Sequence, residues 1–223
     1  MIAQRLLTSV ARAALVTGHN TPKMRSMRIP SSRWPRKPPR DKAKNLGRGV
    51  NGPPKSEIAP RTLPVYRLHP ENGQLVETNM LWGLIPNYAK ERPSFRPLYA
   101  PAELISRRRM FHDAYNKRRC IVCMNEFHHR DRFRNRRTIV HREGKPLSFA
   151  GIWENWHDPN TSEWERSFAI VTVKAHGLVA DIHDRMPLVL DEANLHRWLN
   201  LENDLGDLSR FSATIQSELT VLS

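Results

Sequence analysis

The chain has 223 residues, a formal net charge of +14, 39% hydrophobic residues and a mean hydropathy of −0.60. This length is enough for one good hydrophobic core with a tail, and no apolar run approaches the roughly 20 residues of a membrane-spanning helix, so we expect a soluble protein with no membrane partner. The positive charge is unevenly placed. Residues 1–50 contain 12 Lys and Arg and one acidic residue, whereas residues 51–223 contain 24 and 21.

Residues 1–55 are rich in Pro, Arg, Lys and Ser and contain no acidic residue before Asp41. This composition cannot bury enough apolar surface to order itself, so we predict a basic, disordered tail. Arg12 interrupts the apolar run that a secretory signal peptide would need, and an organellar transit peptide is the alternative. The tail could attract a polyanion in a salt-sensitive way, or it could serve only to keep the protein in solution.

The folded domain is predicted to span residues 56–223. Apolar runs bounded by turn residues predict strands at 63–68, 75–77, 80–86, 118–124, 146–153, 167–173 and 188–190, with a hairpin turn at 71–74. Apolar spacing predicts a helix within 104–117 and an amphipathic helix over 191–201. Residues 128–142 are polar and very basic. Many strands with few helices indicate an α+β domain dominated by antiparallel sheet.

The two cysteines, Cys120 and Cys123, are too few for a disulfide-stapled secreted protein and suit a reducing compartment. Their CxxC spacing, with His128 and His129 nearby, raises the possibility of a zinc site, but structural zinc normally takes four ligands. Adjacent histidines on a strand point to opposite faces, and so do residues three apart. We therefore interpret both cysteines as core thiols and predict no metal site.

An imidazole, a carboxylate and a guanidinium follow one another at His183, Asp184 and Arg185. They lie on the predicted connection between the strands at 167–173 and 188–190, where a rigid scaffold can aim polar side chains. This trio is a candidate functional site. The alternative is an ordinary turn in which Asp184 and Arg185 pair and satisfy local backbone groups.

Four short segments stand in a characteristic order along the chain: 82–86 (WGLIP), 118–122 (RRCIV), 149–154 (FAGIWE) and 183–187 (HDRMP). Together they resemble the SOS-response-associated (SRAP) family of abasic-site processing proteins, and the resemblance covers residues 56–201. It implies an α+β fold that is mainly an antiparallel β-sheet or barrel with a few flanking helices. With it we expect a monomer that binds single-stranded or abasic-site DNA in the DNA damage (SOS) response and needs no cofactor.

Members of this family trap the aldehyde of an abasic sugar with the amine and thiol of an N-terminal cysteine, which close a thiazolidine ring. A His, a Glu and an Asn support the reaction. The resemblance places His183 at the His position, His129 at the Glu position and Tyr99 at the Asn position. Pro101 stands in place of an Arg that contacts DNA in the family.

The nucleophile is the largest departure from the family pattern. Residue 2 is Ile2, and no cysteine precedes Cys120, so we expect the covalent chemistry to be impaired or lost. His129 could in principle move protons near neutral pH, because an unperturbed imidazole titrates there. His183 is the one member of the family's catalytic set that is retained.

The resemblance also indicates which side chains would contact DNA. Trp82 and Tyr88 lie where the family presents stacking aromatics, although a Trp on a strand more often belongs to the core. The other candidates are the basic residues Arg118, Arg119, Lys174 and Arg185.

Three hypotheses about function remain open. The first is an SRAP-fold protein that binds single-stranded or damaged DNA with little or no covalent chemistry. The second is an active abasic-site lyase or peptidase-like enzyme that uses another nucleophile. The third is a basic scaffold associated with nucleic acid through its tail. If the source is bacterial, we expect a cytoplasmic, nucleoid-associated protein.

Overall fold

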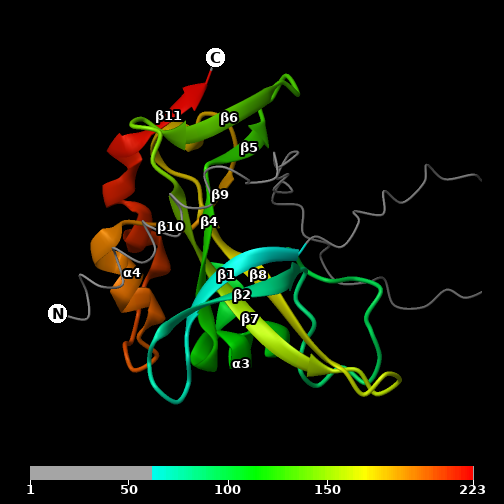
Figure 1. Ribbon diagram of the computed structural model, residues 1–223. Helices are drawn as coiled ribbons and strands as arrows, with labels where there is room; N and C mark the ends of the chain where they lie inside the picture. The colour runs from blue at the N-terminus through cyan, green and yellow to red at the C-terminus, as the bar shows by residue number, and fades with distance from the viewer. Residues whose placement is uncertain (1–61, 223) are drawn as a thin grey trace, which may run out of the picture.

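The structure is a computed structural model that describes residues 62–222. The predicted tail over residues 1–55 and the predicted start of the domain at residue 56 lie outside the described residues. The described part contains an eight-stranded sheet and a separate three-stranded sheet, with helices packed beside them (Figure 1). None of the helices in this part has the length and apolarity needed to cross a bilayer.

Five strands of the larger sheet close on themselves into a barrel. They are β1 (Thr62–Leu68), β2 (Leu75–Trp82), β4 (Arg119–Met124), β7 (Leu147–His157) and β8 (Trp164–Lys174). Around the ring, β1 pairs antiparallel with β2 and β4, β4 with β7, and β7 with β8, while a short parallel pairing of β2 with β8 completes the closure. The expected α+β fold with mainly antiparallel sheet is confirmed.

The remaining strands extend the barrel and form the second sheet. β3 (Tyr99–Pro101) and β9 (Arg185–Pro187) pair with β8, and β10 (Val189–Leu190) pairs with β7. The three-stranded sheet lies at one end of the barrel (Figure 1) and consists of β5 (Glu126–Arg130), β6 (Arg136–His141) and β11 (Leu219–Leu222). The end of the chain is therefore bound to a hairpin from its middle.

The helices follow strands that lie at the edge of the barrel. α2 (Ala102–Ile105) and α3 (Arg109–Lys117) come after β3, and α4 (Glu192–Leu199) comes after β10. At the start of α4, the side chain of Asp191 accepts a hydrogen bond of 2.8 Å from the backbone N–H of Asn194, which satisfies one of the free donors of the first turn. The described residues also contain short 3-10 helices: η2 (Gly177–Val179) precedes β9, whereas η3 (Leu208–Ser212) and η4 (Thr214–Glu218) lie between α4 and β11.

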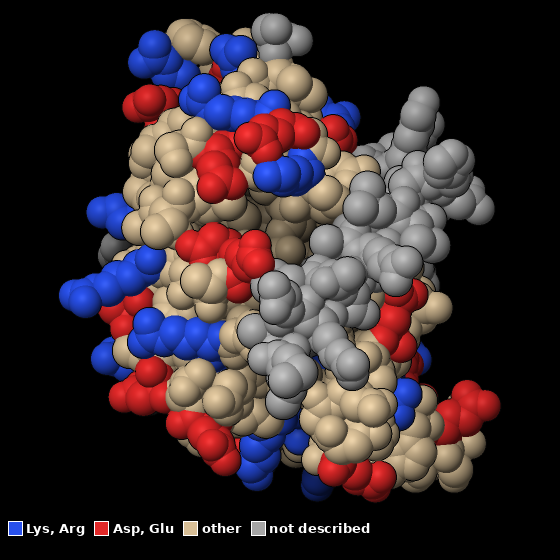
Figure 2. Space-filling model, turned by 60° about the vertical axis from the view of Figure 1, so that its left-hand side comes forward, with Lys and Arg blue, Asp and Glu red and all other residues tan. Residues whose placement is uncertain are grey.

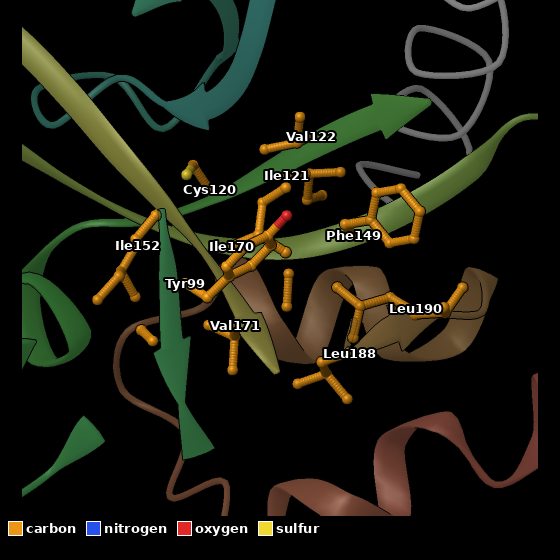
Figure 3. Packing of buried hydrophobic residues seen from close by; sticks show 14 of the residues in the cluster. Tyr99, Cys120, Ile121, Val122, Phe149, Ile152, Ile170, Val171, Leu188 and Leu190 are labelled. Carbon is orange, nitrogen blue, oxygen red and sulfur yellow. The ribbon is translucent and has the colours of Figure 1, made fainter. Parts of the chain in front are cut away.

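The hydrophobic core fills the barrel and continues under α4. Side chains of β4, β7, β8 and the segment around β10 meet there (Figure 3), and fully buried ones such as Phe149 and Ile170 contribute about 1.5–3 kcal/mol each. The indole N–H of Trp198 donates to the carbonyl of Cys120 at 2.9 Å and so attaches α4 to β4. Gly151 of β7 crosses Cys120 so closely that a Cβ would lie 2.9 Å from the sulfur.

Most of the predicted elements are present with shifted ends. The two strands predicted at 75–77 and 80–86 are one strand, β2, which ends at Trp82 because Gly83 turns the chain with a φ of +126°. The basic segment 128–142, for which no strand was predicted, contains most of β5 and all of β6, including the β-branched run 138–140. β5 and β6 pair with each other, and β6 also pairs with β11 from the far end of the chain.

Candidate functional site

Two histidines from distant parts of the chain stack on each other. His129 belongs to β5, and His183 precedes β9. Their ring centroids are 4.2 Å apart, and the ring planes are inclined by 19°. Solvent reaches only 2% of His129 and 10% of the His183 side chain. The two candidate catalytic histidines therefore form one shielded site.

The connection between η2 and β9 fixes the orientation of His183. Its backbone N–H donates to the carbonyl of Val179 at 2.9 Å, which closes a turn. Its ring Nδ1 accepts from the backbone N–H of Arg185 at 3.0 Å and lies 3.1 Å from a carboxylate oxygen of Asp184. Because Nδ1 is held in this way, Nε2 is the nitrogen that remains for a ligand.

Arg185 joins this connection to the neighbouring elements. One terminal nitrogen, Nη1, lies 2.8 Å from a carboxylate oxygen of Glu103 in α2. The other, Nη2, donates to the backbone carbonyl and the hydroxyl of Thr172 in β8, at 2.7 and 3.0 Å. The planar guanidinium thus bridges α2, β8 and β9. Its main visible role is to hold the backbone on which His183 is mounted.

The surroundings of His129 keep its ring neutral. Burial lowers the pKa of His129 to about 3, and the nearby His183 and His128 lower it as well, while Asp184 opposes them. The edge of the Phe127 ring contacts it, with centroids 5.6 Å apart. Neither ring nitrogen of His129 has a hydrogen-bond partner among the described residues. His129 is therefore a neutral imidazole with one donor and one acceptor unused.

Both cysteines lie in β4, within the barrel wall. Cys120 is fully buried, as predicted, whereas Cys123 is partly exposed and packs against the core. Burial raises the pKa of Cys123 to about 11 and that of Cys120 further still. Both are protonated thiols at neutral pH, so neither is an activated nucleophile. Over residues 62–222, no three His, Cys, Asp or Glu side chains gather in a way that could hold a metal ion.

Three of the candidate DNA contacts are used inside the protein. Trp82 is buried, its indole N–H donates to the carbonyl of Leu98 at 2.9 Å, and its ring packs on Phe168. The alternative of a core tryptophan is therefore the one that the structure supports, and we leave Trp82 out of the DNA interface.

The two arginines at the start of β4 are also committed to internal partners. The guanidinium of Arg118 donates to the buried carboxylate of Glu154 at 2.9 Å. Arg119 is itself buried and donates to three backbone carbonyls, those of Tyr115, Trp198 and Asn200. Arg119 is therefore left out of the DNA interface, because a phosphate cannot reach its buried guanidinium. Arg118 is partly exposed, but its guanidinium neutralises Glu154, so we leave it out as well.

Besides Arg185, whose guanidinium is bonded to Glu103 and Thr172, two candidates remain, and both are accessible. Tyr88 is exposed, and the guanidinium of Arg109 lies 4.3 Å from the centre of its ring. Lys174 is exposed at the end of β8, directly opposite Arg185 of β9. Lys174 therefore lies on the strand pair that carries the histidine connection.

Two partners in the site were not predicted as site residues. Glu103 and Thr172 hold Arg185 because α2, β8 and β9 converge. Nearby, the Tyr99 side chain lies in the core, where burial raises its pKa and leaves its hydroxyl without a hydrogen-bond partner among the described residues. Tyr99 therefore cannot offer the site the exposed amide that an Asn would.

Comparisons with known proteins agree with the fold and the motifs. A family model described as SOS response associated peptidase (SRAP) matches residues 32–222. The abasic site processing protein YoqW of Bacillus subtilis is 34% identical over 127 residues, which cover 55% of this chain and 56% of YoqW. The abasic site processing protein HMCES of Xenopus tropicalis is 24% identical over 156 residues, covering 58% and 47%. The chain thus spans about half the length of the curated relatives it matches.

Solved structures show the same fold at low identity. A protein from Bacteroides thetaiotaomicron superposes with a TM-score of 0.62 and 23% identity, over 72% of both chains. A protein from Bordetella bronchiseptica superposes with a TM-score of 0.57 and 20% identity, over 72% of this chain and 82% of its own. Because the family model covers most of the sequence and the fold agrees, the chain belongs to the SRAP family, the SOS response associated peptidases.

Proposed function

We propose that this protein binds single-stranded DNA at abasic sites and recognises the opened sugar at the His129–His183 pair, without a thiol-based covalent step. The names of its relatives, abasic site processing proteins, support the substrate class. The SOS response in the family's description supports a place in the response to DNA damage.

The observation that carries this proposal is the unsatisfied imidazole of His129. A buried polar group without a partner costs about 1–3 kcal/mol, so the site is poised for a ligand that supplies the missing hydrogen bonds. The open form of an abasic sugar has an aldehyde oxygen that accepts and hydroxyl groups that donate. A neutral imidazole can meet one of each, and Nε2 of His183 lies beside it.

The chemistry of the described thiols and imidazoles supports the proposed lack of a covalent step. Trapping an aldehyde in a stable ring takes an amine and a thiolate held together. Cys120 and Cys123 are protonated thiols in the barrel wall, and an imidazole does not form an equivalent lasting adduct. His129 also replaces the carboxylate expected from the family pattern, and its low pKa makes it a poor base at neutral pH.

The DNA strand would approach over the exposed rim of this site. Lys174 is placed to meet a phosphate, because it is exposed and lies on the β8–β9 pair next to the histidine connection. Tyr88 is an exposed aromatic that could stack on a base farther from the pair, because Arg109 at the start of α3 lies over one face of its ring. Arg185 contributes by positioning His183.

The test compares an abasic and an intact single strand of the same sequence. Fluorescence anisotropy should show tighter binding to the abasic strand, and His129→Ala or His183→Ala should lower this preference by roughly tenfold, as expected for lost buried hydrogen bonds. His129→Gln keeps a neutral polar group and should lose less. His112→Ala is the control, since His112 is exposed on α3, at the other end of the molecule from β5 (Figure 1).

A denaturing gel of the same mixtures tests the covalent step. We expect no adduct that survives denaturation. A stable adduct that persists in His183→Ala and in the Cys120→Ser, Cys123→Ser double variant would show that another nucleophile acts. Equal affinity for the abasic and intact strands would refute recognition of the sugar.

A further inference from the structure

The turn between β5 and β6 concentrates positive charge next to the histidine pair. Between residues 128 and 137 the only acidic residue is Asp131, against five arginines: Arg130, Arg132, Arg134, Arg136 and Arg137. The face of the molecule that carries α4 is different, because basic and acidic side chains are interspersed there (Figure 2). The charge at the turn is therefore a local feature of this hairpin.

Hydrogen bonds to Asp131 give the turn a defined shape. One carboxylate oxygen of Asp131 accepts from the backbone N–H groups of Phe133 and Asn135, each at 2.9 Å. The other accepts from Nε of Arg137 at 3.0 Å. The backbone adds two more hydrogen bonds, from Asp131 N–H to the Asn135 carbonyl and from Arg134 N–H to the Asp131 carbonyl. Five residues are thus held in one conformation.

This shape presents an aromatic ring and an arginine together to the solvent. The Phe133 side chain is an exposed hydrophobic group at 68% relative exposure, and the Arg132 guanidinium lies 4.8 Å from the centre of its ring. Asp131, the acidic residue of the turn, pairs with Arg137. Within residues 62–222 no acidic side chain forms an ion pair with Arg132 or Arg134. An exposed ring between unpaired arginines is the combination that binds a single strand without sequence preference.

The strand pairing itself favours a polyanion. Arg130 of β5 lies directly opposite Arg136 of β6. Like charges directly opposite each other destabilise an antiparallel pair. A bound phosphate backbone would remove this repulsion, whereas solvent only screens it.

We propose that residues 131–135 form a clamp for the single strand that flanks the nucleotide at the His129–His183 pair, with Phe133 stacking on a base and Arg132 and Arg134 meeting phosphates. The clamp rests on the proposed function, because it assigns the flanking strand of the same DNA. Phe133 lies four residues beyond His129, which is at most about 14 Å of extended chain. That distance spans about four stacked nucleotides at ~3.4 Å each.

The test measures binding of a fluorescent strand of about 15 nucleotides, with and without one central abasic site. Phe133→Ala should weaken binding to both strands about tenfold, the loss expected for one stacked base. Trp164→Ala is the matched control: Trp164 is 65% exposed but begins β8, at the end of the barrel away from β5 (Figure 1). It should leave the affinity unchanged.

The arginines are tested through salt. In the Arg132→Gln, Arg134→Gln double variant, the slope of log affinity against log salt concentration should become shallower by about 1.4, because each lost contact to a single strand removes about 0.7. Arg210→Gln removes an exposed arginine on η3 and should leave the slope unchanged. Circular dichroism melting confirms that each variant is folded, which is expected because the changed side chains are exposed.

The outcomes separate the two proposals. If the unaltered chain shows no preference for the abasic strand but Phe133→Ala still weakens binding to both strands, abasic recognition fails and the clamp stands. If Phe133→Ala and the double arginine variant bind both strands as tightly as the unaltered chain, the clamp is wrong. It is also wrong if the unaltered chain binds no DNA. The same variants are measured with RNA and with vesicles containing phosphatidylserine, and a loss of affinity for these ligands but not for DNA would also contradict the clamp.

Discussion

The imidazole of His129 lies almost parallel to that of His183, with ring centroids 4.2 Å apart and 19° between the planes. One ring comes from the small sheet and the other from the connection that precedes β9 in the large sheet. Two stacked imidazoles repel each other when both are charged, and burial disfavours even one charge. The pair therefore suits hydrogen bonding to a neutral sugar better than proton transfer at neutral pH.

The stability of the protein should fall in mild acid because of His129. Its folded pKa of about 3 lies below the ordinary value, so the unfolded chain takes up a proton below about pH 6.5 while the folded protein does not. This contribution is complete above pH 6.5 and is lost as the pH falls towards 3. Between pH 6.5 and pH 5 it amounts to about 2 kcal/mol in the free energy of unfolding.

The variant His129→Gln isolates this effect, because Gln does not titrate while His183, Asp184 and His128 around it are unchanged. In urea unfolding at pH 7.5 and pH 5, the unaltered chain should lose more stability than the variant, by about 2 kcal/mol. Parallel losses in both proteins would mean that His129 is protonated as readily in the folded state as in the unfolded chain.

Replacing Arg185 with Lys should loosen the histidine connection. A lysine cannot reach Glu103 and Thr172 together, so one partner loses its hydrogen bonds. Because Glu103 is 55% exposed, water replaces that contact at little cost, and most of the loss of about 1–2 kcal/mol arises at the Thr172 carbonyl.

Urea unfolding measures this loss, and DNA binding should show a smaller preference for the abasic strand. Glu103→Gln is the comparison, with a loss below about 1 kcal/mol. If Glu103→Gln costs as much as Arg185→Lys, the ion pair matters more than the contact with β8.

Gly151→Ala should destabilise the barrel by about 1–3 kcal/mol. The new Cβ would lie 2.9 Å from the sulfur of Cys120 and 3.4 Å from the carbonyl of Ala169, and neither neighbour can move far inside the core. Cys120→Ala in the same chain removes the sulfur and should recover part of the loss. A double-mutant cycle by thermal unfolding measures the coupling, and purely additive effects would show that the clash is not with Cys120.

Arg118→Met should destabilise the protein by about 3 kcal/mol, because it leaves the buried carboxylate of Glu154 without its cationic partner. Burial already raises the pKa of Glu154, and Arg118 opposes that rise. Adding Glu154→Gln should therefore restore part of the stability. At a temperature where Arg118→Met is folded, the salt dependence of DNA binding should match the unaltered chain, and a shallower slope would return Arg118 to the DNA interface.

The sequence by itself determined the fold class, the main strands and helices, and the family. The runs at 63–68 and 167–173 are apolar enough to specify buried strands, and the spacing in 104–117 specifies a helix, because burial of local apolar patterns dominates these choices. The order of four short motifs was sufficient for the family because motif order does not depend on knowing the contacts.

Only the tertiary structure decided which side chains work together. An arginine in a basic segment is a typical DNA contact. Arg119, however, is buried and donates to three backbone carbonyls at the ends of α3 and α4. The basic β5–β6 hairpin, in which no strand was predicted, pairs through β6 with β11 from the far end of the chain. His129 meets His183 because two sheets converge, and such long-range packing depends on the whole chain at once rather than on any window of it.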